Sequence, residues 1–160
     1  MVVALGCLVA TVVDIRTRRI PNVLTAAMAT VGAGLAATGI SGLSVWGSVL
    51  GLVVGLLLMM PGHLLGATGA GDVKLMAAIG AIVGPALVIS AFLFSAIAGG
   101  VLAVAVAITR RRLSATLAGT GRLIATPSGA KQEIRSAPAA HRFAYGPAIA
   151  VGSVIAVLMG

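Results

Sequence analysis

The chain has little charge, few aromatic residues and almost no cysteine. Only 9% of its 160 residues are charged and only 3% are aromatic, whereas charged residues make up about 25% of an average soluble domain. Cys7 is the only cysteine, which excludes an intramolecular disulfide bond and a zinc site built from cysteines. The acidic residues are Asp14, Asp72 and Glu133 alone. Any chemistry that needs carboxylates must therefore use these three side chains.

Apolar residues, in contrast, make up 59% of the chain. The core of a soluble domain does not need so many apolar residues, so the composition predicts an all-α, polytopic membrane protein. In a soluble protein the net charge of +8 would indicate a nucleic-acid partner. Here aromatic residues are scarce and the basic residues lie between apolar runs. We therefore predict no nucleic-acid partner and attribute the positive charge to membrane topology.

Six apolar segments predict about six transmembrane helices in a single membrane domain, residues 1–160. Gly84 and Pro85 divide the uncharged run 75–108, because proline ends or kinks a helix. The expected helices cover approximately residues 1–13, 23–40, 43–60, 73–84, 86–108 and 143–159, and a basic loop covers residues 109–142.

Basic residues occupy every second connection between these segments. The opposite connections, near 41–42 and 84–85, carry no charge. By the positive-inside rule the charged connections face the cytoplasm and both termini face outward. The basic loop also contains leucines and an isoleucine on one side, so we expect it to contact the anionic inner leaflet. The basic residues are Arg16, Arg18, Arg19, Lys74, Arg110, Arg111, Arg112, Arg122, Lys131, Arg135 and Arg142.

Small residues recur along the third segment. Gly47, Gly51 and Gly55 are four residues apart and therefore lie on one face of a helix. This pattern predicts a face on which the backbone of another helix approaches closely.

Asp14 and Asp72 are the two acids that adjoin apolar segments, and the topology puts both at the cytoplasmic side. Burial and repulsion between like charges raise the pKa of one carboxyl group in such a pair, so that the two groups hold one proton between them. That state suits peptide hydrolysis, in which the ionised acid activates water and the protonated acid polarises the scissile carbonyl. The residues alone leave open the alternative that Asp14 and Asp72 are structural acids at the membrane edge. Glu133 is expected to be a solvated charge.

Three sequence motifs favour the catalytic interpretation of Asp14 and Asp72 over the structural one. The segment DIRTRRIPN, residues 14–22, has an acid five residues before Ile-Pro-Asn. Together with GAGDVKLMAAIG, residues 69–80, and FAYGPAIAVG, residues 143–152, it resembles the type IV prepilin peptidases, which are membrane aspartyl proteases of the GxGD type. The resemblance implies that the catalytic aspartates are Asp14 and Asp72. It also implies motif residues that shape the site or let the substrate approach, namely Gly69, Gly71, Lys74, Pro21, Asn22, Tyr145, Gly146 and Pro147.

Individual roles follow as expectations from this resemblance. We expect Pro21 in the first turn of the second helix, Lys74 near lipid headgroups and Tyr145 as an anchor at the membrane interface. His63 and His141 belong to no cluster of metal ligands, so we expect both to be structural, and we predict no metal.

Long members of this family carry a cytoplasmic insertion with paired CxxC zinc motifs, and many also N-methylate the pilin. Here about nine residues join the first two segments, which resembles the short form that serves Flp/Tad-type pili. The resemblance implies a prepilin or pseudopilin substrate, cleavage of its cytoplasmic leader, a bacterial inner-membrane location and no cofactor. S-adenosylmethionine is expected only if a methyltransferase activity exists. The alternatives are an archaeal-type preflagellin peptidase, a catalytically dead pilus-assembly scaffold and a small membrane transporter.

Overall fold

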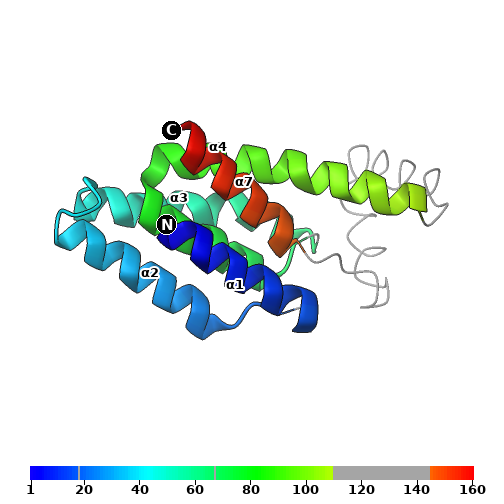
Figure 1. The fold of residues 1–160 in the computed structure, drawn as a ribbon, viewed down its shortest axis with the longest axis horizontal. Helices are drawn as coiled ribbons and strands as arrows, with labels where there is room; N and C mark the ends of the chain where they lie inside the picture. Colours follow the sequence, from blue (N-terminus) through cyan, green and yellow to red (C-terminus); the bar gives the residue numbers. More distant parts are fainter. Residues whose placement is uncertain (18, 67, 110–144) are drawn as a thin grey trace.

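The computed structural model describes residues 1–17, 19–66, 68–109 and 145–160. Within these ranges the chain forms five helices and no strand (Figure 1). The all-α fold class predicted from the sequence is therefore confirmed. The basic loop expected at 109–142, with Glu133 and His141, lies beyond Thr109 outside the described residues. The helices are α1 (Val2–Thr17), α2 (Asn22–Ala37), α3 (Val45–Leu64), α4 (Ala70–Thr109) and α7 (Gly146–Met159).

Helix α4 bends at one residue. Gly84 has φ 85° and ψ 176°, a left-handed conformation that favours glycine, and Pro85 follows it directly. The sequence predicted two helices here, 73–84 and 86–108, and α4 does consist of two helical parts that are joined by non-helical backbone at Gly84. Beyond this bend the second part of α4 extends past the other helices (Figure 1).

Several helix ends differ from the expected ones. Helix α1 continues past residue 13 to Thr17, so Asp14 lies inside its last turn. Helix α2 ends before residue 40, because Gly39 has a φ of 73°. Helix α3 starts later than expected because the hydroxyl of Ser44 caps it, accepting the N–H of Gly47 at 3.0 Å. It also continues through Pro61 to Leu64.

Small residues let α3 and α4 approach closely. A methyl group added to Gly51 would overlap the carbonyl of Gly80, and one added to Gly55 would meet the carbonyl of Met76 at 2.5 Å. The predicted close approach is correct for these two glycines. For Gly47 the close approach of another helix is not shown, because the three atoms nearest to an added methyl group belong to Leu43 and Ser44, just before α3.

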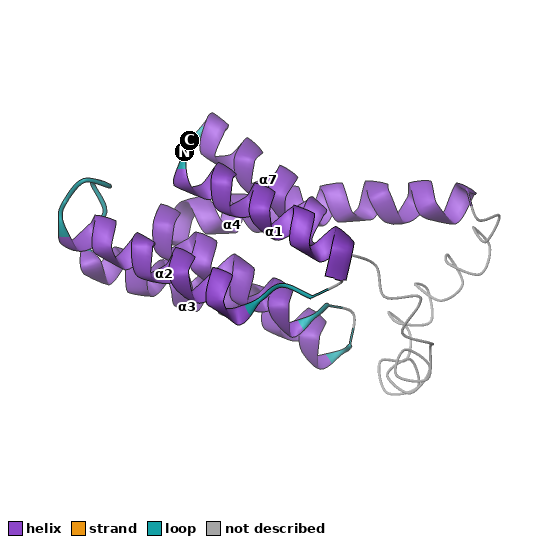
Figure 2. Cartoon of the chain, turned by 60° about the horizontal axis from the view of Figure 1, so that its bottom comes forward, coloured by secondary structure: helices purple, strands orange, loops and turns teal. Residues whose placement is uncertain are grey.

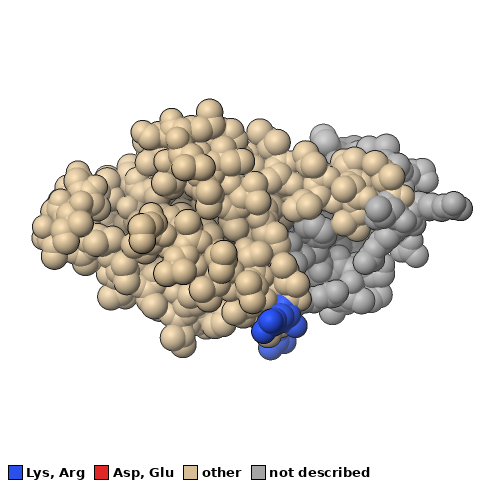
Figure 3. All heavy atoms as spheres, in the orientation of Figure 1, with Lys and Arg blue, Asp and Glu red and all other residues tan. Residues whose placement is uncertain are grey.

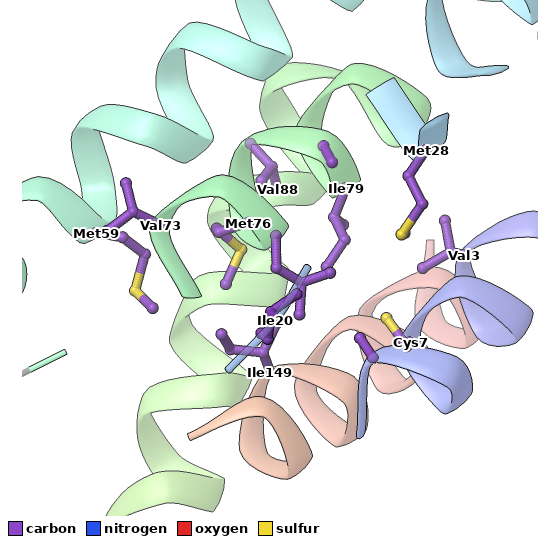
Figure 4. Packing of buried hydrophobic residues seen from close by; sticks show 13 residues of the cluster. Val3, Cys7, Ile20, Met28, Met59, Val73, Met76, Ile79, Val88 and Ile149 are labelled. Atoms are coloured by element: carbon purple, nitrogen blue, oxygen red, sulfur yellow. The ribbon is translucent and has the colours of Figure 1, made fainter. Parts of the chain in front are cut away.

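The buried core gathers around the first part of α4, as Figure 4 shows. Side chains from α1, α2, α3 and α7 all reach it, and the fully buried residues at its centre are large and apolar. They include Leu75, Met76, Ile79, Val88 and Ile149. The first turn of α4, which carries Asp72, is thus fixed on several sides by packing.

The outside of the bundle is apolar as well. Leu5, Leu8, Trp46 and Ile97 are each more than 60% exposed. Among the described residues, α3 and the segment Ala70–Val106 of α4 are long and apolar enough to cross a membrane, while α2 and α7 are shorter apolar helices. The structure therefore shows two helices of spanning length, and the expected six spans are not shown.

The two ends of the bundle differ in character. At one end, the two chain termini lie near each other (Figure 2), and Met1 and Val157 line one apolar hollow together with Leu43. The end of α1 and the starts of α2, α4 and α7 lie at the other end. This second end holds the two acids.

Candidate active site

Asp14 lies in the last turn of α1 and is only 5% exposed. Its Oδ2 atom accepts a hydrogen bond from the backbone N–H of Gly146, the first residue of α7, at 3.0 Å. The first N–H groups of a helix have no partner within the helix, so the carboxyl group satisfies one of them. Asp14 thus joins α1 to the start of α7.

Asp72 lies in the first turn of α4 and is 8% exposed. Its Oδ2 atom accepts a hydrogen bond from the backbone N–H of Gly69 at 3.0 Å. Since Gly69 directly precedes the helix, this contact caps α4 from within its own first turn. The glycine-rich turn and the acid therefore form one local unit.

Both acids line one cavity of about 470 Å³. The charge of Asp14 acts on Asp72, and no described residue donates a hydrogen bond to the Oδ1 atom of either one. The sequence predicted that the two carboxyl groups meet at one level of the bundle, and the structure brings them together. The other residues that line this cavity are Arg19, Ile20, Pro21, Asn22, Gly69, Ala70 and Gly71.

The segment between α1 and α2 forms one wall of this cavity. A methyl group on Gly71 would lie 3.0 Å from the Cβ atom of Ile20, so glycine lets this segment pack directly on the start of α4. Pro21 has φ −63° and ψ 136° and directly precedes α2. The sequence expected Pro21 inside the first helical turn, which is wrong by one residue.

Lys74 and Asn22 connect the two motifs on the outside of the cavity. The Nζ atom of Lys74 donates a hydrogen bond to Oδ1 of Asn22 at 2.9 Å, and both residues are exposed. The sequence suggested lipid headgroups as the neighbours of Lys74 and did not identify Asn22, itself a predicted motif residue, as its hydrogen-bond partner. The two residues are 52 positions apart, and no local pattern pairs them.

We expect this contact to contribute modestly to stability. A double-mutant cycle with Asn22→Ala and Lys74→Met should give a coupling energy of about 0.5 kcal/mol, because exposed polar pairs contribute little. Thermal unfolding of the four proteins in detergent would measure it. Additive single and double variants would show that the contact contributes nothing.

Tyr145 directly precedes α7 and is half-buried. Its hydroxyl donates a hydrogen bond to the backbone carbonyl of Ser95 at 3.2 Å, and its ring fills the space beside Gly99. It also lies near enough to Asp72 for the charge of that group to act on it. The structure thus packs Tyr145 between α7 and the second part of α4, whereas the sequence suggested an interfacial anchor. Pro147 lies in the first turn of α7.

His63 is not among the residues that line the cavity of the two acids. Its Nδ1 atom is 3.1 Å from the carbonyl oxygen of Thr68, so it holds the turn between α3 and α4. Among the described residues there is no group of three or more histidine, cysteine, aspartate and glutamate side chains that could bind a metal ion.

Comparison with known proteins adds one finding. The family model described as the type IV leader peptidase family matches residues 1–104. No curated protein and no solved structure matches the chain. The matched residues include Asp14, Asp72 and the glycine-rich turn, while Tyr145, Gly146 and Pro147 follow them in the sequence. Because the match covers more than half of the sequence, the chain belongs to the type IV leader peptidase family.

Proposed function

We propose that this protein is an aspartic endopeptidase that removes the leader peptide of type IV prepilins or pseudopilins, and that Asp14 and Asp72 carry out the reaction. One observation supports this most strongly. The two carboxyl groups of the described residues are both buried and line the same cavity, in a member of a leader peptidase family. Acids are otherwise almost absent from the chain.

The proposed mechanism needs one proton shared by the two acids. Two buried carboxylates that repel each other hold a proton between them. The ionised group takes a proton from a water molecule, whose oxygen attacks the scissile carbonyl carbon, while the protonated group donates a hydrogen bond to the carbonyl oxygen. The proton then passes to the leaving amine as the C–N bond breaks. This route uses no cofactor and no metal.

The hydrogen bonds described above suit these roles. In each acid a glycine N–H holds Oδ2, and Oδ1 has no hydrogen-bond donor among the described residues. We propose that the two Oδ1 atoms face the water and the substrate carbonyl. Gly69 on the cavity wall would let an extended peptide backbone approach, whereas Ile20 fills the space beside Gly71.

We further propose that the protein spans the bacterial inner membrane several times. The apolar outer surface suits lipid, and the Lys and Arg side chains of the described residues gather at one place in the view of Figure 3. Arg19 lines the cavity, and Lys74 contacts Asn22 beside it. The positive-inside rule would then put the cavity at the cytoplasmic face, next to anionic lipid, with both termini outward.

The connection between α1 and α2 supports a substrate of the Flp/Tad type. Only residues 18–21 separate these helices, which leaves no place for a zinc-binding insertion. A methyltransferase activity with S-adenosylmethionine is not part of the proposal, and neither is a nucleic-acid partner.

Leader removal from co-expressed prepilins tests this function. A panel of Flp-type prepilins would be expressed with and without the chain, followed by gel shift and N-terminal sequencing of the pilin. We expect a shorter pilin with one new N-terminus only when the chain is present. Unprocessed pilin throughout the panel would contradict the proposal and favour a transporter or an assembly scaffold.

A further inference from the structure

The contact between Asp14 and Gly146 joins residues that are 132 positions apart, and it is buried. A side chain at this position would displace that of Asp14. An added Cβ atom would lie 2.6 Å from Oδ2 and 3.1 Å from Cβ of Asp14, which is closer than ordinary packing allows. Any larger residue would therefore push the Asp14 side chain away from the N–H that now holds it.

The N–H of Gly146 is itself held in place from the other side. The hydroxyl of Tyr145 donates a hydrogen bond to the backbone carbonyl of Ser95. The hydroxyl of Ser95 lies 3.4 Å from the carbonyl oxygen of Ile149. One turn further along α7, the backbone of Gly152 packs directly against Ser95. The start of α7 is thus fixed to α4 at several points, and its first N–H has a fixed direction.

Asp72 is held in the same manner by a different part of the chain. Gly69 donates to its Oδ2 atom at 3.0 Å, as Gly146 does to Oδ2 of Asp14 at the same distance. Each acid thus has one oxygen bound by a glycine N–H and one oxygen left over. The two donors lie at the starts of different helices, Gly69 directly before α4 and Gly146 at the first position of α7.

We propose that Gly146 is a positioning residue for Asp14. Its N–H selects the side-chain orientation that leaves Oδ1 for the attacking water, and its missing side chain makes the contact possible. The Tyr145-Gly146-Pro147 motif then affects the reaction by orienting Asp14, and it does not contact the substrate. This inference rests on the proposed function, because it takes Asp14 to be one of the two reacting acids.

Gly146→Ala tests the proposal. We expect kcat for prepilin cleavage to fall ~100-fold, because a displacement of about 1 Å in a reacting group has an effect of this size. We expect KM to change less than about twofold, since the proposal places no substrate contact at Gly146. Purified protein in detergent, with the folded fraction measured separately, gives both constants.

Two control variants separate positioning from packing. Gly32→Ala lies on α2, and its methyl group would meet the backbone carbonyl of Ala81 at 2.8 Å, so it should lower the unfolding temperature while the folded fraction keeps its kcat. Gly100→Ala adds a methyl group with nothing within 4 Å, so it should keep kcat and should not lower the unfolding temperature. Equal loss of kcat per folded molecule in Gly146→Ala and Gly32→Ala would overturn the proposal, as would wild-type kcat in Gly146→Ala.

A semisynthetic protein covers the case in which Gly146→Ala does not fold. Glycolic acid at position 146 replaces the N–H by an oxygen atom and adds no side chain. We expect the same loss of kcat, and unchanged kcat would contradict the proposal.

An infrared measurement is independent of cleavage. The carboxyl band that disappears in Asp14→Asn should shift in Gly146→Ala, and an unshifted band would overturn the inference even if no prepilin is cleaved. Absence of cleavage by the wild type together with a shifted band would contradict the proposed function alone.

Discussion

Replacing Asp14 or Asp72 with asparagine is expected to lower kcat for leader cleavage by ~10³-fold, within the range that a general acid or base supplies. Asparagine has nearly the same shape as aspartate, and its side-chain oxygen still accepts the N–H of Gly146 or Gly69. It neither accepts nor supplies the proton that the reaction requires. The fold and the membrane abundance should therefore be retained while the chemistry is lost.

The double variant makes this test sharper. If the two acids act as one unit, Asp14→Asn combined with Asp72→Asn should be no slower than either single variant. Glu133→Gln serves as the control, because it removes the third acid of the chain. Cleavage by either single aspartate variant at a rate near that of the wild type would rule out the paired mechanism.

Gly51→Ala is expected to destabilise the bundle by about 3 kcal/mol. The added methyl group would overlap the carbonyl of Gly80 and come within 2.9 Å of the carbonyl carbon of Gly84. These neighbours are backbone atoms of α4, so no side chain can rotate away, and the two helices would have to separate. Chemical or thermal unfolding in detergent measures the loss.

Gly34→Ala is the matched control for this prediction. Gly34 also lies inside a helix, but an added methyl group there meets nothing within 4 Å. Alanine favours the helix over glycine, so this variant should gain about 0.5 kcal/mol. If both variants have the same stability, the close approach of α3 and α4 does not limit the side chain at Gly51.

The features that the sequence predicted well depend on local rules. Proline after glycine interrupts a helix, and the chain does bend at Gly84 and Pro85. The alternation of charged and uncharged connections put Asp14 and Asp72 at one level, where the structure brings them into one cavity. Both predictions needed only neighbouring residues and the order of segments.

The features that the sequence missed depend on how distant segments pack. Nothing near Gly146 in the sequence indicates that its N–H meets Asp14, and nothing near Asn22 indicates Lys74. The third helix was predicted to end at residue 60, whereas it continues through Pro61 for one further turn. Equal spacing also does not give the three glycines equal neighbours, because backbone atoms of α4 are nearest to Gly51 and Gly55, whereas Leu43 and Ser44 are nearest to Gly47.

The hydrogen bond between Gly146 and Asp14 also sets an order of events during translation. The ribosome makes Asp14 132 residues before its donor, so the acid has no such partner until α7 has been synthesised and docked. A nascent chain that has completed α1 to α4 holds both carboxyl groups but lacks the contact that orients one of them. Maturation of the site is thereby tied to the arrival of its last helix.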